Sequence, residues 1–181
     1  MLWLLAMLLG LVLGLGAGGH LENLLRLRFR WPLLVLAAVI VRGAVEVTPL
    51  NRVEGAQYVY LLSLLAIAGW TVWHVKLLPG VWAVSAGATL NLVVIAANGA
   101  RMPVASQYAG SLVQRGHIGQ YTLMTSSTNL NALGDWMSLG PLRGVYSPGD
   151  LLVALGLALV LLVATHREPE TAVPAGKPQD V

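Results

Sequence analysis

Cysteine is absent from this chain, and charged side chains are scarce. Without cysteine there are no disulfides, no thiol catalysis and no cysteine-based metal site. Charged residues make up 10% of the 181 residues and hydrophobic residues 56%, whereas ordinary soluble domains have about 25% charged residues. A soluble protein needs more charge to cover its surface, so the composition indicates that lipid is the solvent for much of the chain.

Several kinds of functional motif are also missing. Basic residues outnumber acidic ones only 11 to 8, and without a basic stripe or binding motif we expect no nucleic-acid partner. No nucleophile elbow, phosphate-binding loop or zinc-helix motif accompanies His117, Ser126 and Asp135, which could otherwise be assembled into a hydrolytic set. We therefore expect neither an enzyme nor a cofactor or metal, with a bis-histidine site at His20 and His74 as a minor alternative.

Long apolar segments separated by polar connections predict an all-α integral membrane protein with about five transmembrane helices. The predicted spans are residues 1–19, 31–49, 57–75, 81–97 and 148–165, within a single domain of residues 1–165. At 1.5 Å per residue such segments reach roughly 26–29 Å, close to the ~30 Å hydrocarbon core. The first segment could instead be a cleaved signal peptide, but its length and the lack of a preceding basic residue favour a retained span.

Charges at the ends of the spans predict the orientation. Basic residues on the inner side would be Arg26, Arg28, Arg30, Lys76, Arg167 and Lys177, and those on the outer side Arg52, Arg101, Arg115 and Arg143. The excess of basic residues on one side places the N-terminus outside and the C-terminus in the cytoplasm. Residues 166–181 contain three prolines and mixed charge, and we expect them to form a disordered cytoplasmic tail.

Glycine and charged residues within the spans mark faces that should meet protein. Gly10, Gly14 and Gly18 recur every fourth residue, a spacing that lets another helix pack closely. Arg42 and Glu46 lie one turn apart inside the second span, so we expect an intramembrane ion pair. This pair is either structural, with Arg42 reaching the outer interface, or part of a functional site.

Residues 98–147 are the one long segment that is neither a span nor a tail. We expect an extracytoplasmic capping loop, partly buried or re-entrant, since irregular backbone at membrane depth must be covered by protein. Residues 104–115 within it show the periodicity of a short amphipathic helix. At its end, Ser147 and Asp150 predict a capping box that starts the last span.

A polar pocket is expected beneath this loop. Asn91 and Asn98 share one face of the fourth span, and Arg101, His117 and Asp135 follow in the loop. These residues form the candidate pocket because buried amides and charges on one face should meet protein or water rather than lipid. Hydrogen bonding between helices is the alternative role for the two asparagines.

The loop also carries a set of short motifs. They are Asn98-Gly99-x-x-Met102-Pro103-Val104, Leu133-Gly134-Asp135 and Ser147-Pro148-Gly149-Asp150. On these motifs the chain, apart from its tail, resembles the small bacterial integral membrane proteins of domain-of-unknown-function family 5317, in which the first motif more usually has one residue between its Gly and Met. The resemblance implies a multi-pass protein of the bacterial cytoplasmic membrane. It implies no activity, so no catalytic role is carried over to Asn98, Asp135 or Asp150.

Two classes of function fit these features. The small size, the glycine face and the lack of convergent chemistry favour an accessory subunit or membrane scaffold. Its partners would be the lipid bilayer and a second membrane protein or further copies of itself. The alternative is a small-molecule or ion transporter or binding protein, with its polar pocket under residues 98–150. The lack of an inverted repeat counts against transport.

Overall fold

The computed structural model of the chain describes residues 1–27, 29–49, 53–140 and 142–167, without the side chains of Glu46 and Arg143. Arg28, Arg52, Lys177 and most of the expected tail therefore lie outside the described residues. The main helices are α1 (Leu2–Gly16), α2 (Leu21–Leu25), α3 (Pro32–Val47), α4 (Ala56–Trp73), α5 (Val81–Ala97) and α7 (Pro148–Ala164). Between α5 and α7 lie β1 (Met102–Val104), η2 (Ser106–Tyr108), α6 (Leu112–Arg115), β2 (His117–Ile118), β3 (Tyr121–Leu123), η3 (Asn131–Leu133), β4 (Met137–Leu139) and β5 (Leu142–Tyr146).

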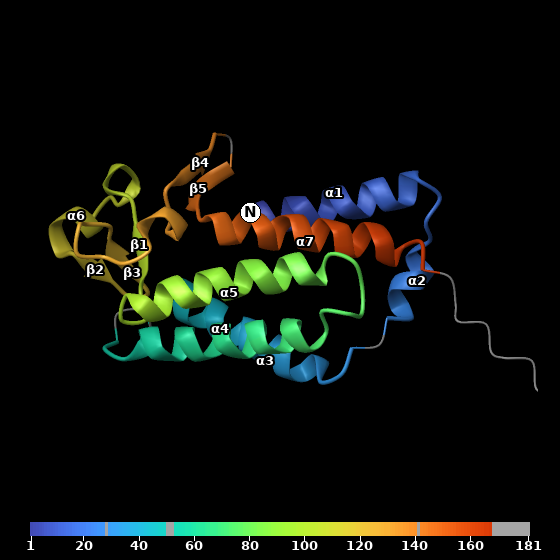
Figure 1. Cartoon of the computed structure of the whole chain (residues 1–181), viewed down its shortest axis with the longest axis horizontal. Helices are drawn as coiled ribbons and strands as arrows, with labels where there is room; N and C mark the ends of the chain where they lie inside the picture. Colours follow the sequence, from blue (N-terminus) through green and yellow to red (C-terminus); the bar gives the residue numbers. More distant parts are fainter. Residues whose placement is uncertain (28, 50–52, 141, 168–181) are drawn as a thin grey trace, which may run out of the picture.

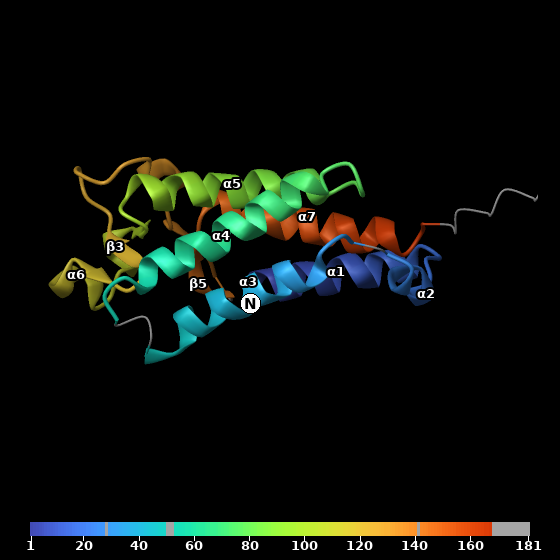
Figure 2. The same cartoon turned by 90° about the horizontal axis from the view of Figure 1, so that it is seen from below.

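The long helices form an arc. Neighbouring helices pack in the order α1, α7, α5, α4 and α3, and α1 and α3 lie on the side away from α5 (Figures 1 and 2). The strands, the η-helices and α6 form a cap over one end of this bundle, here called the capped end (Figure 1). At the opposite end, here called the α2 end, lie α2 and the connection between α4 and α5 (Figure 1).

The long helices lie close to the segments that the apolar pattern predicts. The first is shorter than the expected 1–19, because Gly18 adopts a φ of +94°, a left-handed conformation that stops a helix. The second begins at Pro32, where proline's fixed φ suits the first helical turn and its missing N–H needs no partner. The apolar runs therefore predict where the long helices lie, whereas the end of the first helix was misplaced.

One helix of the described residues, α4, is long and apolar enough to qualify as a membrane span, with 18 residues and a mean hydropathy of 1.3. The other apolar helices, α1, α3, α5 and α7, have 15, 16, 17 and 17 residues. A single qualifying helix is weak evidence, since a core helix of a soluble protein passes the same test. Length and composition of the helices thus do not support the expected five spans.

The segment 98–147 corrects the all-α expectation, because it contains small β-structures. Strand β3 pairs in parallel with β1 and antiparallel with β2, and β4 and β5 pair as an antiparallel hairpin. The amphipathic helix expected over residues 104–115 is wrong as well: η2 and α6 stand there, separated by Gly110 at φ +50°. The backbone of β1 bonds to β3 instead of continuing a helix, and the left-handed glycine separates the two short helical turns.

Glycines allow α7 to pack tightly against α1. A Cβ on Gly10 would overlap the backbone of Ala158, and a Cβ on Gly14 would lie 3.2 Å from the Cα of Leu162. Gly18, the third glycine of the predicted stripe, has nothing within 4 Å of its Cβ position. Two of the three glycines therefore pack helices, and the third ends one.

A second set of glycines joins α7 to α5. Gly87 shares the face of Asn91 that was expected to meet protein, whereas no packing role was predicted for Gly149 and Gly156. A Cβ on Gly87 would lie 2.8 Å from the amide nitrogen of Val153, and one on Gly156 would lie 2.7 Å from the carbonyl oxygen of Gly80. A Cβ on Gly149, at the start of α7, would lie 2.7 Å from the carbonyl oxygen of Gly87. These contacts place the first turn of α7 directly beside the middle of α5.

Candidate functional site

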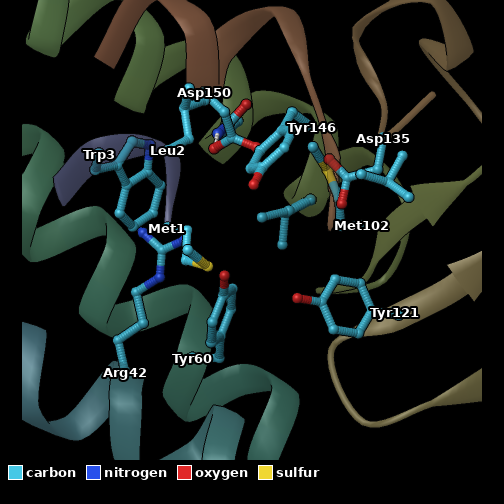
Figure 3. A pocket seen from close by; sticks show the side chains of 13 residues that line it. Met1, Leu2, Trp3, Arg42, Tyr60, Met102, Tyr121, Asp135, Tyr146 and Asp150 are labelled. Atoms are coloured by element: carbon cyan, nitrogen blue, oxygen red, sulfur yellow. Dashed lines mark hydrogen bonds between the residues drawn. The ribbon is translucent and has the colours of Figure 1, made fainter. Parts of the chain in front are cut away.

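A cavity of about 170 Å³ lies at the capped end of the bundle, between the helices and the cap (Figure 3). Its polar lining residues are Arg42, Tyr60, Asn91, Tyr121, Asp135, Tyr146 and Asp150. The hydroxyl groups of the three tyrosines turn toward its middle (Figure 3). Side chains from α3, α4, α5, α7 and the cap thus converge on one small polar space.

Arg42 enters this cavity from α3 between two aromatic rings. Its guanidinium carbon lies 5.1 Å from the ring centroid of Trp3 and 5.0 Å from that of Tyr60. Each such cation–π contact contributes about 0.5–2 kcal/mol. The guanidinium also carries five N–H donors, which form hydrogen bonds in the plane of the group. The side chain of Glu46 lies outside the described part of the chain, so the Arg42–Glu46 pair stays a prediction.

Asp135 forms part of the opposite wall (Figure 3). Its backbone N–H donates to the carbonyl of Pro103 over 2.8 Å, and its carbonyl accepts from the N–H of Ala105 over 2.9 Å. This close approach requires the preceding glycine, since a Cβ on Gly134 would lie 2.7 Å from the Pro103 carbonyl. The residue is 8% exposed. Strand β1 and Ala105 therefore fix the backbone that carries this carboxylate, on the side of the cavity away from Arg42 (Figure 3).

The third polar feature is a closed hydrogen-bond network between α5 and the first turn of α7. The predicted capping box is present: the Ser147 hydroxyl accepts from the Asp150 N–H over 3.0 Å, and the Asp150 carboxylate accepts from the Ser147 N–H over 3.1 Å. Asn91 joins it, donating to Asp150 Oδ1 over 2.9 Å and accepting from the Ser147 hydroxyl over 2.8 Å. Asn91 thus forms a hydrogen bond between helices, and it also lines the cavity.

The structure brings together only part of the predicted pocket. Asn91 and Asp135 line the cavity, whereas Arg101 and His117 line a separate surface hollow of about 500 Å³. Asn98 has a structural contact instead: its side chain donates to the carbonyl of Asn129 over 2.9 Å and accepts from that residue's N–H over 2.8 Å. It therefore ties the polar run of the cap to the end of α5.

The cavity adjoins a more open hollow of about 390 Å³ in the cap. The two share the lining residues Met1, Tyr121, Asp135, Val145 and Tyr146. The rest of the hollow is formed by cap residues, among them Tyr108 and Leu112. The hollow and the cavity thus share a wall that includes Asp135, whereas Arg42 lines the cavity alone.

Sequence reasoning missed most of the aromatic lining. It gave Trp3, Tyr60, Tyr121 and Tyr146 no role in a pocket. One signal was available, because Tyr146 directly precedes the correctly predicted N-cap Ser147. Trp3 and Tyr121 lie far from Arg42 in the sequence, and only the packing of the helices brings them to one cavity.

No cluster of three metal-ligating side chains is found among the described residues. The alternative pair of His20 and His74 gains no support from the environment of His74. Nε2 of His74 accepts from the Arg30 N–H over 3.1 Å, and Nδ1 lies 2.8 Å from the carbonyl of Trp70. Nε2 therefore holds the connection before α3 against the end of α4, and Nδ1 contacts the last turn of α4 itself.

Comparison with known proteins gives one match. The model of a family described as a family of unknown function, DUF5317, matches residues 26–162. This range includes α3 to α5, the whole cap and most of α7, and it confirms the resemblance seen in the sequence motifs. No curated protein and no solved structure matches the chain.

Proposed function

The chain belongs to the DUF5317 family, whose function is unknown, and from its structure we propose that it is a multi-pass membrane protein that binds a small polar molecule. The observation that carries this proposal is the cavity at the capped end, where a guanidinium, carboxylates and tyrosine hydroxyls meet in about 170 Å³. A concave site with a few converging polar groups is the usual form of a small-molecule site.

Apolar side chains on the outside of the bundle support the membrane part of the proposal. Leu4 of α1, Leu33 of α3 and Leu62 of α4 are 71%, 76% and 62% exposed. Further exposed apolar residues on the same helices are Leu8, Leu9, Val12, Leu36, Ile40, Leu65 and Val72. Apolar patches of this extent are unfavourable in water and mark contact with lipid or protein. At the α2 end, Trp31 and Trp73 are also exposed, as expected for an interfacial aromatic belt.

Five spans remain the arrangement we favour, although four of the helices are short. Helices of 15–17 residues are roughly 22–26 Å long, and local thinning of the bilayer can accommodate such a deficit. Arg30 and Lys76 flank helices at the α2 end, while Arg101 and Arg115 belong to the cap. In the orientation expected from the sequence, the cap and the cavity face the outside of the cytoplasmic membrane.

Binding fits the cavity better than conduction does. Against its lining, buried side chains of α3, α4 and α5 pack as one cluster, which includes Val45, Leu64, Val94 and Ile95. Toward the α2 end, the glycine contacts bring α5 and α7 together without intervening side chains. The accessory-subunit role remains a prediction, and a binding subunit could deliver its ligand or its signal to a partner.

A variant whose larger side chain fills the space between the hollow and the cavity tests this proposal. Val145 lines both the cavity and the hollow that leads to it, so Val145→Trp should close the path. Val113→Trp is the control, because Val113 is exposed on the cap. In a thermal-shift screen of small polar compounds, wild-type protein and Val113→Trp should be stabilised by the same compounds, and Val145→Trp should not. A screen in which all three variants respond alike would contradict the proposal.

A further inference from the structure

We infer that a groove between α3 and α4 at the α2 end binds one anionic phospholipid, with an acyl chain in the groove and the phosphate on Arg30. This inference rests on the membrane part of the proposed function and concerns a site separate from the polar cavity. The groove has a volume of about 390 Å³. Its lining is mainly apolar, and the apolar side chains are those of Trp31, Leu34, Leu65, Ala66, Trp70 and Trp73.

The shape of the groove suits a hydrocarbon chain. Its lining follows α4 from Trp73 at the end of the helix to Leu65, eight residues earlier, which is roughly 12 Å of helix. Gly69 lies between them, and nothing lies within 4 Å of its Cβ position. Glycine is unfavourable inside a helix, and the packing of the protein does not require it here. An open groove does, because a side chain at position 69 would fill it.

Two side chains of α4 fix Arg30 beside this groove. The Arg30 N–H donates to Nε2 of His74 over 3.1 Å, and the Arg30 carbonyl accepts from Nε1 of Trp70 over 2.8 Å. The rings of Trp70 and His74 support each other, with centroids 4.2 Å apart. Both hydrogen bonds use backbone atoms of Arg30. They therefore position the residue without occupying its guanidinium.

Trp31 has a conformation that binding of a lipid would explain. Its φ of +58° and ψ of +46° are left-handed, which costs energy in a residue with a Cβ. Such conformations cluster where a ligand is held. The side chain lines the groove although 71% of the residue is exposed. An indole ring suits the boundary between acyl chains and headgroups, since it has an apolar body and a polar N–H.

The charges at the α2 end favour an anionic headgroup. Among the described residues, the basic side chains there are those of Arg26, Arg30, Lys76 and Arg167, and the acidic one is that of Glu22. Basic side chains beside a membrane attract anionic lipids. A guanidinium also presents its donors in a plane that matches two phosphate oxygens. An anionic phospholipid therefore complements both the apolar groove and the positive charge beside it.

Three compounds separate the contributions of the headgroup and the acyl chains. We would titrate dioleoyl phosphatidylglycerol, dioleoyl phosphatidylcholine and glycerol 3-phosphate into the full chain in a nonionic detergent, and count bound molecules by native mass spectrometry. One phosphatidylglycerol should bind per chain, about tenfold or more tightly than phosphatidylcholine, since a charge-assisted hydrogen bond gives that factor. Equal affinity for the two lipids would overturn the inference. Saturable binding of glycerol 3-phosphate that Arg30→Gln abolishes would assign the site to a free phosphate compound and overturn the lipid.

Variants of the groove assign the two parts of the lipid. Arg30→Gln keeps the backbone hydrogen bonds and should lower the affinity for phosphatidylglycerol to that for phosphatidylcholine. Gly69→Leu should fill the groove and abolish saturable binding of both lipids.

The controls lie outside the lining of the groove. Lys76→Gln removes a charge at the same end, and Gly16→Leu adds the same side chain at another glycine with nothing within 4 Å of its Cβ position. Both controls should bind as the wild type does, and melting curves show which variants are folded. Arg30→Gln alone decides the matter if Gly69→Leu does not fold. Binding that neither groove variant changes would show that the lipid lies elsewhere.

Two further results separate this inference from its alternatives. A wild-type dimer without bound lipid that Gly69→Leu converts to a monomer would place a second copy of the chain in the groove and overturn the lipid. Washing membranes with alkaline carbonate tests the membrane part of the proposed function separately. Protein that stays in the membrane but binds no phosphatidylglycerol overturns the groove alone, whereas release of the wild type would contradict both proposals.

Discussion

Asn91 donates a hydrogen bond to Asp150 Oδ1 over 2.9 Å, across 59 positions of the sequence. This contact joins the middle of α5 to the capping box of α7, beside the close approach of Gly87 and Gly149. It also forms part of the cavity wall. The stability of the helix pair and the shape of the cavity therefore depend on the same side chains.

Replacing Asn91 by leucine should destabilise the protein. Leucine leaves the Ser147 hydroxyl and Asp150 Oδ1 without their partner in a buried site, and an unsatisfied buried group costs about 1–3 kcal/mol. We expect a lower melting temperature for Asn91→Leu in detergent. Ser85→Ala is the matched control on α5: its buried hydroxyl makes no hydrogen bond, so its removal should leave the melting temperature unchanged or raise it. Equal losses in the two variants would contradict the network's role.

The close contact between α1 and α7 predicts that replacing two different glycines of α1 by alanine changes stability very differently. An alanine at position 10 would overlap the backbone of Ala158, whereas one at position 16 has nothing within 4 Å of its Cβ. Gly10→Ala should therefore cost about 1–3 kcal/mol through overpacking, and Gly16→Ala should be neutral or slightly stabilising. Melting curves of both variants measure this difference. A Gly10→Ala protein as stable as the wild type would show that α1 does not pack on α7 in this way.

The hydrogen bonds of His166, at the α2 end, predict that the stability of the protein depends on pH. Its Nδ1 lies 2.9 Å from the carbonyl of Leu162 and its Nε2 lies 3.2 Å from that of Ala17. These hydrogen bonds raise the pKa of His166, because only the imidazolium carries a proton on both nitrogens. A raised folded-state pKa stabilises the protein fully below the unfolded value of about 6.5, and this contribution is lost as the pH rises through the folded value.

The measurement for His166 is the melting temperature of wild type and His166→Gln at two pH values. The wild type should exceed the variant at a pH of about 5.5, and the difference should shrink or vanish at a pH of about 8.5, following the linkage above. A difference that stays constant over this range, or that grows with pH, would contradict the two carbonyl contacts.

The proposed orientation can be tested cleanly because the chain has no cysteine of its own. Arg115→Cys in the cap and Lys76→Cys at the α2 end place single thiols at exposed positions. In intact cells, a membrane-impermeant maleimide should label the first and not the second, and lysis should make both reactive. Labelling of Lys76→Cys alone in intact cells would reverse the orientation, and labelling of neither before lysis would place the cap inside.

The sequence predicts the helices of this fold better than its cap or its site. The apolar runs and the Ser147–Asp150 box are local signals, and the helices and the capping box that they predict are present. The cap was misread because β1 is three residues long and pairs with β3, a strand far along the chain, a contact that leaves no periodic pattern. The cavity combines Trp3, Arg42 and Tyr146 from distant segments, so its composition depends on the packing of the whole chain.

Binding of a small polar molecule that enters the capped-end cavity past Val145 can be measured by equilibrium dialysis. The compound that most stabilises wild type in the thermal-shift screen is dialysed against wild type, Val145→Trp and Val113→Trp, with melting curves showing that all three are folded. We expect one bound molecule per chain for wild type and Val113→Trp, and none for Val145→Trp. Equal saturation of all three proteins, or no saturable binding to any of them, would contradict the proposed binding site.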